Sequence, residues 1–150
     1  MAINLKNFLL SQNRKSIIGH FQDLDHIDGV AISTISANLY KDPRDDLVLF
    51  YFRDGANCAS VYTQSKIISE NIKWNLNVKN NSIKALMVNT RNANAFTGKL
   101  GFKGIVQIAE ELSKQLTIKI TQDEENINSV KPNQILFGCT GTIGETFPTE

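Results

Sequence analysis

The sequence of 150 residues predicts a fold of the α/β (α+β) class, in which a mixed β-sheet packs with helices. In the first half, residues 30–37 and 47–52 are β-prone runs joined by a polar turn, which predicts an antiparallel hairpin. In the second half, an apolar strand at 83–88, an amphipathic helix at 101–116 and another apolar strand at 135–137 follow one another. The sequence contains no internal repeat and no low-complexity linker, and its length fits one domain with a sizeable core or a large piece of a bigger domain.

The predicted hairpin depends on period-two patterning. From Gly29 onward, small and apolar residues alternate to residue 37, and small side chains on both faces suit a strand covered on both sides. Residues 41–46 form a turn by composition, and Leu-Val-Leu-Phe-Tyr-Phe at 47–52 is the strongest strand signal in the chain. Ala-Ser-Val-Tyr-Thr at 59–63 predicts a third strand.

The middle of the chain contains the best helix signal. Apolar residues recur at helical spacing through 101–116, and we expect this stripe to pack in the core. Thr97 or Gly98 is placed to act as the N-terminal cap of this helix. Residues 67–74 fit neither period cleanly and predict either a short helix or an irregular link.

Two segments have weaker patterns. Residues 1–25 fit two short amphipathic helices around a polar connection, and the same segment could instead pack on a partner. The polar and acidic residues 121–131 predict an exposed excursion. Pro132 then lies just before the final strand, where its missing N–H does no harm.

The composition excludes several function classes. The formal net charge of +1 and the scattered basic residues predict no attraction to nucleic acid or to an anionic membrane. No apolar run approaches the ~20 residues that span a bilayer, and without a secretory signal we expect a cytoplasmic location. Cys58 and Cys139 lie too far apart for a CxxC motif, which suits a reducing compartment and offers no zinc site. His20 and His26 flank an acidic patch that predicts a solvated turn rather than a metal site.

The candidate site lies in residues 134–148, where a short apolar strand, expected to be buried on both faces, enters a loop containing Gly138, Gly141 and Gly144. Such a loop can turn sharply and can hold a developing negative charge with N–H and hydroxyl donors. An ordinary strand followed by a glycine-rich turn explains this stretch equally well. We expect the asparagines of the loop at 89–98 to lock its backbone by local hydrogen bonds. Because Ala93, Ala95 and Phe96 are unusually apolar for a solvated turn, we also expect this loop to pack against another segment.

Four motifs occur in the order and at the intervals of a known family. Asn-Thr-Arg-Asn-Ala-Asn-Ala-Phe-Thr-Gly at 89–98 resembles the asparagine-rich motif of the ornithine acetyltransferases (glutamate N-acetyltransferases) of arginine biosynthesis. Cys-Thr-Gly-Thr-Ile-Gly at 139–144 resembles their second signature, Ser-Thr-Gly-Val-Ile-Gly. Residues 44–49 and 59–63 also fall in family order. The resemblance covers residues 28–150 as the α-chain portion of the acetyltransferase domain, and it leaves 1–27 as an N-terminal extension.

The resemblance implies the N-terminal part of the DmpA/ornithine-acetyltransferase-like fold. It also implies transfer of an acetyl group from N-acetyl-L-ornithine to L-glutamate through an acetyl-threonine intermediate. In this family a precursor cleaves itself into α and β chains, which form a heterotetramer of two α and two β chains, and the new N-terminal threonine of β is the nucleophile. The family's oxyanion pair matches Thr140 and Gly141, which would donate through a hydroxyl and a backbone N–H. No cofactor is implied, and acetyl-coenzyme A is a co-substrate only in bifunctional members.

The sequence departs from the family pattern at several positions. Thr90 and Arg91 stand where the family usually has Ser-Gly, and a positive φ at Arg91 would cost ~1 kcal/mol. Cys139 and Thr142 are milder changes. The chain stops at Glu150, before the self-cleavage site that the resemblance implies, so we expect an α-chain portion that is inactive without a β chain.

Three other functions were weighed against acetyl transfer. A phosphate- or nucleotide-binding module would use the glycine loop, but its spacing is neither GxGxxG nor GxxxxGK[ST]. A non-catalytic binding or scaffold fragment of the same fold is the second. Cys139 as the nucleophile is the third, and it needs a base from the distant His20 or His26.

Overall fold

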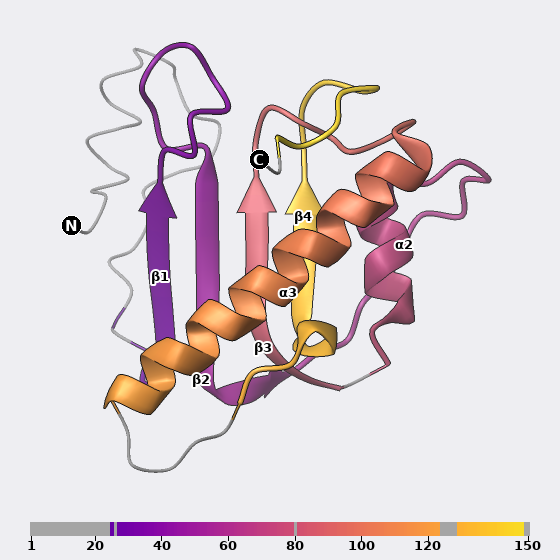
Figure 1. Cartoon of the computed structure of the whole chain (residues 1–150). Helices are drawn as coiled ribbons and strands as arrows, with labels where there is room; N and C mark the ends of the chain where they lie inside the picture. The colour runs from indigo at the N-terminus through magenta and orange to yellow at the C-terminus, as the bar shows by residue number, and fades with distance from the viewer. Residues whose placement is uncertain (1–24, 26, 80, 124–128, 149–150) are drawn as a thin grey trace.

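The computed structural model describes residues 25, 27–79, 81–123 and 129–148. Its elements are β1 (Val30–Ile35), β2 (Leu47–Asn57), α2 (Glu70–Asn77), β3 (Ser82–Asn89), α3 (Gly98–Asp123), η1 (Pro132–Gln134) and β4 (Ile135–Cys139). Figure 1 shows a four-stranded sheet with the helix α3 crossing in front of one of its faces, while α2 lies beside the outer strand β4. The predicted α+β class is confirmed.

The sheet is mixed, with the strand order β1-β2-β3-β4. β1 and β2 are antiparallel with Val30 opposite Phe52, so the predicted hairpin is confirmed. β2 and β3 are also antiparallel, whereas β3 and β4 run parallel and are connected through α3. Because parallel strands end at the same edge of a sheet, the segments after β3 and β4 emerge side by side (Figure 1).

The core lies between the sheet and α3. Ile105 and Ala109 of the helix are fully buried against Ala85, Ile135 and Phe137 of the sheet, as the apolar stripe predicts. Burying each large aliphatic or aromatic side chain contributes roughly 1.5–3 kcal/mol. This cluster therefore holds the central strands β3 and β4 in fixed positions under the helix.

The outer edge of β4 is bonded to side chains of α2. Trp74 donates its indole N–H to the carbonyl of Ile135 at 2.9 Å. The Asn75 amide donates to the carbonyl of Phe137 at 2.9 Å and accepts the N–H of Phe137 at 3.0 Å. Buried backbone groups need partners, so these bonds complete an edge that no further described strand covers.

The face of the sheet opposite α3 is apolar, and no described helix covers it. Ile32 is 63% exposed, while Phe50, Leu86 and Val88 are half-buried. By the alternation of side chains along a strand, these residues point away from the helix-facing Ala85 and Met87. None of the described helices lies on this face (Figure 1).

Three expectations about strands are wrong. Residues 59–63 form no strand, and Val61 is 98% exposed. β-Propensity depends on a neighbouring strand to pair with, and both edges of β3 are already occupied by β2 and β4. The first strand ends at Ile35 and is largely exposed, because it is an outer strand and is not covered on both sides. β4, which we expected to be buried on both faces, is fully buried only on the helix side by Ile135 and Phe137, whereas Leu136 on the opposite face is half-buried.

Other boundaries differ in detail. The ambiguous segment at 67–74 is helical only from Glu70, where α2 begins, and α3 is longer than the predicted 101–116 at both ends. Consequently the excursion expected at 121–131 begins inside α3, and residues 124–128 lie outside the described residues. Pro132 opens the short helix η1 before β4, where it needs no N–H partner. The helices expected in residues 1–25 and the histidines His20 and His26 also lie outside the described part.

Candidate functional site

Two loops meet at the edge of the sheet where β3 and β4 end. We call residues 90–97 the asparagine loop and residues 140–148 the glycine loop. They continue the parallel pairing of their strands, with an isolated bridge between Asn92 and Thr142. Three backbone bonds join them, namely Thr142 N–H to Arg91 C=O at 2.6 Å, Ala93 N–H to Thr142 C=O at 3.0 Å and Gly144 N–H to Ala95 C=O at 2.8 Å. The Thr140 N–H also donates to the carbonyl of Asn89, the last residue of β3, at 3.1 Å. The two signature motifs, fifty residues apart in sequence, therefore form one unit.

Buried asparagines hold the asparagine loop, as the sequence predicts. The Asn89 amide donates to the carbonyls of Thr90 and Asn92, both at 3.0 Å. Asn92 donates to the carbonyl of Thr146 at 3.3 Å and so also reaches the glycine loop. Buried amides that satisfy backbone groups fix an irregular backbone, so this loop is a rigid support for its neighbour.

Asn94 connects the same loop to the start of α3. It is fully buried, accepts the Thr97 hydroxyl at 2.7 Å and donates to the carbonyl of Gly101 at 3.3 Å. Thr97 does precede the helix, but its hydroxyl bonds to Asn94 and not to a helical N–H. A Cβ at Gly101 would overlap both Thr97 and Asn94, which explains a glycine inside the first turn.

Thr140 and Gly141 are exposed directly after β4. A Cβ at Gly141 would overlap the backbone of Arg91, and the φ of +133° also favours glycine. Within the described residues, neither the Thr140 hydroxyl nor the Gly141 N–H has a hydrogen-bond partner. Both donors are thus open to a ligand from outside the chain, and their role in an oxyanion hole stays a prediction.

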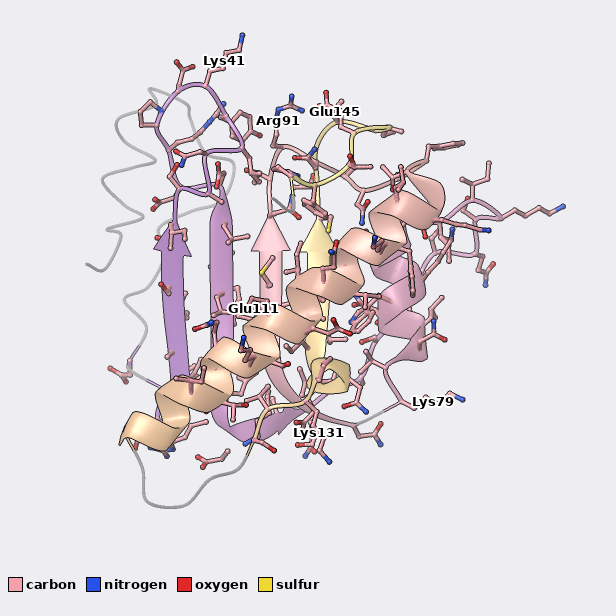
Figure 2. The ribbon with its side chains drawn as sticks, viewed as in Figure 1. Lys41, Lys79, Arg91, Glu111, Lys131 and Glu145 are labelled. Carbon is pink, nitrogen blue, oxygen red and sulfur yellow. The ribbon has the colours of Figure 1, made fainter. Side chains whose placement is uncertain are left out.

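The Arg91 side chain bridges the two loops. Its φ is +85°, so the strain expected at this position is confirmed, at a cost of ~1 kcal/mol. One guanidinium nitrogen donates to the Thr142 hydroxyl at 3.1 Å, and the same nitrogen pairs with the Glu145 carboxylate. Figure 2 shows Arg91 and Glu145 next to each other above the ends of β3 and β4. The sequence does not predict this bridge, because its only signal is a pair of opposite charges at positions 91 and 145.

The structure counts against two of the alternative functions. Burial raises the pKa of the Cys139 thiol to about 12, so the reactive thiolate is scarce at neutral pH. The N–H groups of Thr142 and Gly144 are bonded to carbonyls of the asparagine loop. A phosphate-binding loop would need these backbone N–H groups to be free to bind the anion.

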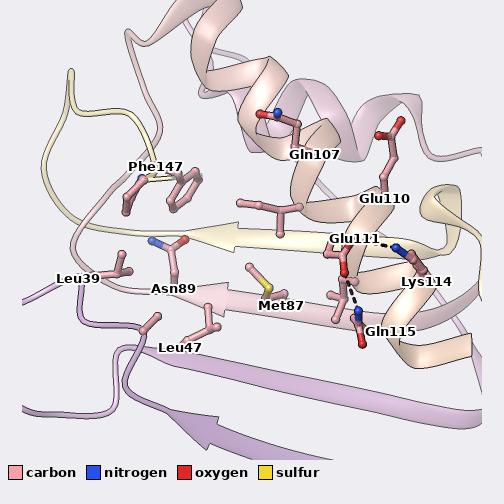
Figure 3. A pocket seen from close by; sticks show the side chains of 14 residues that line it. Leu39, Leu47, Met87, Asn89, Gln107, Glu110, Glu111, Lys114, Gln115 and Phe147 are labelled. Atoms are coloured by element: carbon pink, nitrogen blue, oxygen red, sulfur yellow. Dashed lines mark hydrogen bonds and ion pairs between the residues drawn. The ribbon is translucent and has the colours of Figure 1, made fainter. Parts of the chain in front are cut away.

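A hollow lies on the helix side of the sheet and is distinct from the two donors. Its volume is about 790 Å³, and Figure 3 shows Leu47, Met87 and Asn89 facing α3 across it. Phe147 closes the end near the glycine loop. Of the described residues that line it, none is Thr140 or Gly141. In the described part of the chain, no cluster of three His, Cys, Asp or Glu side chains could hold a metal ion, and no helix has the length and apolarity to span a membrane.

A family model described as the ArgJ family matches residues 31–150. The chain belongs to the ArgJ family. The arginine biosynthesis bifunctional protein ArgJ of Bartonella henselae is 34% identical over 128 residues, which are 84% of this chain and 28% of that protein. The protein of the same name from Bradyrhizobium diazoefficiens is 34% identical over 124 residues, covering 82% of this chain and 27% of the relative. This member thus spans little more than a quarter of these ArgJ relatives.

Solved structures confirm the ArgJ fold. The ornithine acetyltransferase of Mycobacterium tuberculosis, crystallised with ornithine, has a TM-score of 0.73 at 22% identity, covering 81% of this chain and 61% of that one. The ArgJ protein of Bacillus halodurans has a TM-score of 0.66 at 23% identity, covering 81% and 58%. The resemblance read from the motifs is confirmed, and ArgJ proteins are acyltransferases of arginine biosynthesis. The division at residue 28 and the roles of Thr140 and Gly141 remain predictions.

Proposed function

We propose that this chain supplies the α-side part of a glutamate N-acetyltransferase. The enzyme would transfer the acetyl group of N-acetyl-L-ornithine to L-glutamate, with the Thr140 hydroxyl and the Gly141 N–H as its oxyanion hole. One observation carries the proposal: the pairing of the two loops leaves these two donors exposed and without partners among the described residues. Such preorganised donors stabilise charge that develops in a tetrahedral intermediate.

The chemistry runs in two displacements. The N-terminal threonine of a β chain, with its own amine as base, attacks the acetyl carbonyl of N-acetylornithine. The carbonyl oxygen becomes negative and is bonded by the two donors, and ornithine leaves as the amine after taking up a proton. The amine of glutamate then attacks the acetyl-threonine ester through a second oxyanion, and the threonine hydroxyl is restored.

An open apolar surface supports the need for a second polypeptide. The sheet face that bears Phe50, Leu86 and Val88 has no helix on it within the described residues. Together with Ile32, which is 63% exposed, these side chains offer apolar surface that a second polypeptide could cover. The relatives are also several times longer than the matched region, which covers 28% of the Bartonella protein. We propose a heterotetramer of two α and two β chains in the cytoplasm, and no transfer by this chain alone.

The test is reconstitution with the β chain of an ArgJ relative, followed by an assay of acetyl transfer from N-acetylornithine to glutamate. Thr140→Ala should lower kcat by about 100- to 1,000-fold, as expected for one lost oxyanion donor. Thr63→Ala, an equally exposed threonine outside both loops, is the matched control and should leave kcat unchanged. Equal turnover in the Thr140→Ala and wild-type complexes would refute the assigned role. Assembly without any transfer would favour the non-catalytic scaffold.

A further inference from the structure

We propose that Arg91 is a positioning residue, which holds the glycine loop against the asparagine loop through Thr142 and Glu145 and thereby fixes the direction of the Gly141 N–H. The effect on turnover rests on the proposed function, whereas the effect on the loop does not. Arg91 touches neither donor directly through its side chain, so it acts through its two partners in the glycine loop.

Arg91 contacts the glycine loop through both its backbone and its side chain. Its carbonyl accepts the Thr142 N–H at 2.6 Å, while its guanidinium donates to the Thr142 hydroxyl at 3.1 Å and pairs with Glu145. Gly141 lies so close to the Arg91 backbone that a Cβ would overlap the carbonyl. Any shift of Arg91 relative to Thr142 is therefore transmitted to Gly141.

The backbone conformation at position 91 would suit glycine better than arginine. A φ of +85° is adopted readily by glycine and with strain by arginine. Strained residues persist where the surroundings over-determine them. What arginine adds over glycine is its side chain, and both partners of its ion pair and hydrogen bond lie in the glycine loop. The bridge is the physical reason for an arginine here.

The expected size of the effect is modest. The Arg91 and Glu145 side chains are 33% and 44% exposed, and ion pairs at such positions are weak and are screened by salt. We therefore expect changes of about 3- to 10-fold in loop opening. A 3- to 10-fold change is well below the loss of about 100- to 1,000-fold expected for a missing oxyanion donor, so the two roles can be distinguished.

Amide hydrogen exchange in the full chain tests the bridge without reference to activity. Arg91→Met should speed exchange of the Thr142 and Gly144 N–H groups about 3- to 10-fold, because the loop opens more often. The Cys58 N–H, bonded to Asn81 at 3.1 Å, should not change. Raising the salt concentration should speed the same two amides in the wild type but not in Arg91→Met. Unchanged exchange at Thr142 and Gly144 in Arg91→Met would overturn the proposal.

Three further variants sharpen this measurement. Arg53→Met removes an arginine of another exposed ion pair, at 3.0 Å from Asp54, and should leave the loop amides unaffected. Arg91→Gly removes the strain together with the bridge, so its loop should open faster although the whole chain is no less stable. Arg91→Met and Thr142→Val combined should give less than the product of their separate effects, because both remove the same contact. Fully multiplicative effects would contradict the bridge.

Kinetics of the reconstituted complex give the functional readout. Arg91→Met should lower kcat about 3- to 10-fold with KM unchanged, since the oxyanion exists only during reaction. Arg91→Lys keeps a donor and should recover part of the loss. A changed KM with constant kcat would overturn a role in positioning the donors. If the wild-type complex transfers no acetyl group, the proposed function fails, and the exchange experiment still decides whether Arg91 holds the loop.

Discussion

Each loop of the site follows one of the two parallel strands β3 and β4, but the two loops are held in place by different interactions. The asparagine loop is anchored by side chains, because Asn92 and Asn94 are almost wholly buried within it. The glycine loop buries no side chain, and only Glu145 and Phe147 are half-buried in its described residues. It is held through backbone bonds to its neighbour and through the Arg91 bridge.

The buried asparagines stabilise the fold, whereas the exposed donors of the glycine loop are available for the reaction. Buried amides stabilise the fold when their bonds are made and cost free energy when a partner is lost. Exposed donors contribute little to folding, so they remain available to a reacting group. We therefore expect substitutions in the asparagine loop to lower stability first, and substitutions at Thr140 or Gly141 to lower turnover first.

The largest effect should come from Gly141→Ala, because the new side chain would clash with the asparagine loop. The added Cβ overlaps the Arg91 backbone, so the glycine loop must move and its N–H donor is misdirected. We expect a loss of at least ~100-fold in kcat in the reconstituted complex. Gly144→Ala is the matched control, because its φ of +86° is equally unusual but nothing lies within 4 Å of its Cβ position. Similar kinetics for the two variants would break the distinction.

Asn94→Ala tests the support side of the comparison. It removes a fully buried amide and leaves the carbonyl of Gly101 and the Thr97 hydroxyl without this partner. The free energy of unfolding should fall by about 2–3 kcal/mol, measured by urea denaturation. Asn77→Ala removes an exposed amide bonded at 2.9 Å to Lys73 and should cost well under 1 kcal/mol. Equal costs would show that burial of the loop asparagines does not matter.

Asn75→Ala extends the comparison to the strand that leads into the glycine loop. The N–H of Phe137 loses its partner and its carbonyl keeps only the long bond from the Asn71 amide at 3.5 Å, at a cost of about 1–2 kcal/mol in denaturant unfolding. Because β4 should loosen at its outer edge, exchange of the Phe137 N–H should rise more than exchange of the Ala93 N–H. Faster exchange at Ala93 than at Phe137 would mean that the loops do not depend on β4 in this order.

At neutral pH the smallest expected effect is that of the Cys139 thiol, because its titration changes the free energy of unfolding only above about pH 9. Its pKa of about 12 lies above the ordinary value of 9.0, so the folded state favours the neutral thiol. This stabilisation is complete below pH 9 and is lost as the pH rises toward 12, with a slope below ~1.4 kcal/mol per pH unit. Cys139→Ala should remove that part of the pH dependence, which unfolding at pH 8 and pH 10.5 would detect. An unchanged slope would show that the thiol titrates normally.

The sequence predicts the fold well where a local pattern determines it. The hairpin, β3 and the apolar stripe of α3 follow from period and composition, and the family motifs identify Thr140 and Gly141 as candidates. The exposed segment at 59–63 is not predicted, since its β-propensity is real but every edge of β3 is taken. The Arg91 bridge depends on a contact across 54 residues of sequence, which no local rule supplies.

The bonding of α2 to β4 has one more consequence, for how this sheet can be enlarged. The outward polar groups of Phe137 and the carbonyl of Ile135 are already taken by Asn75 and Trp74. An incoming strand, whether from a longer polypeptide or from a stray copy, would have to displace a helix there. Unpaired edges invite such additions, and among the described strands the outer edge of β1 has no strand partner, so β1 is the side where we expect growth or unwanted self-association to begin.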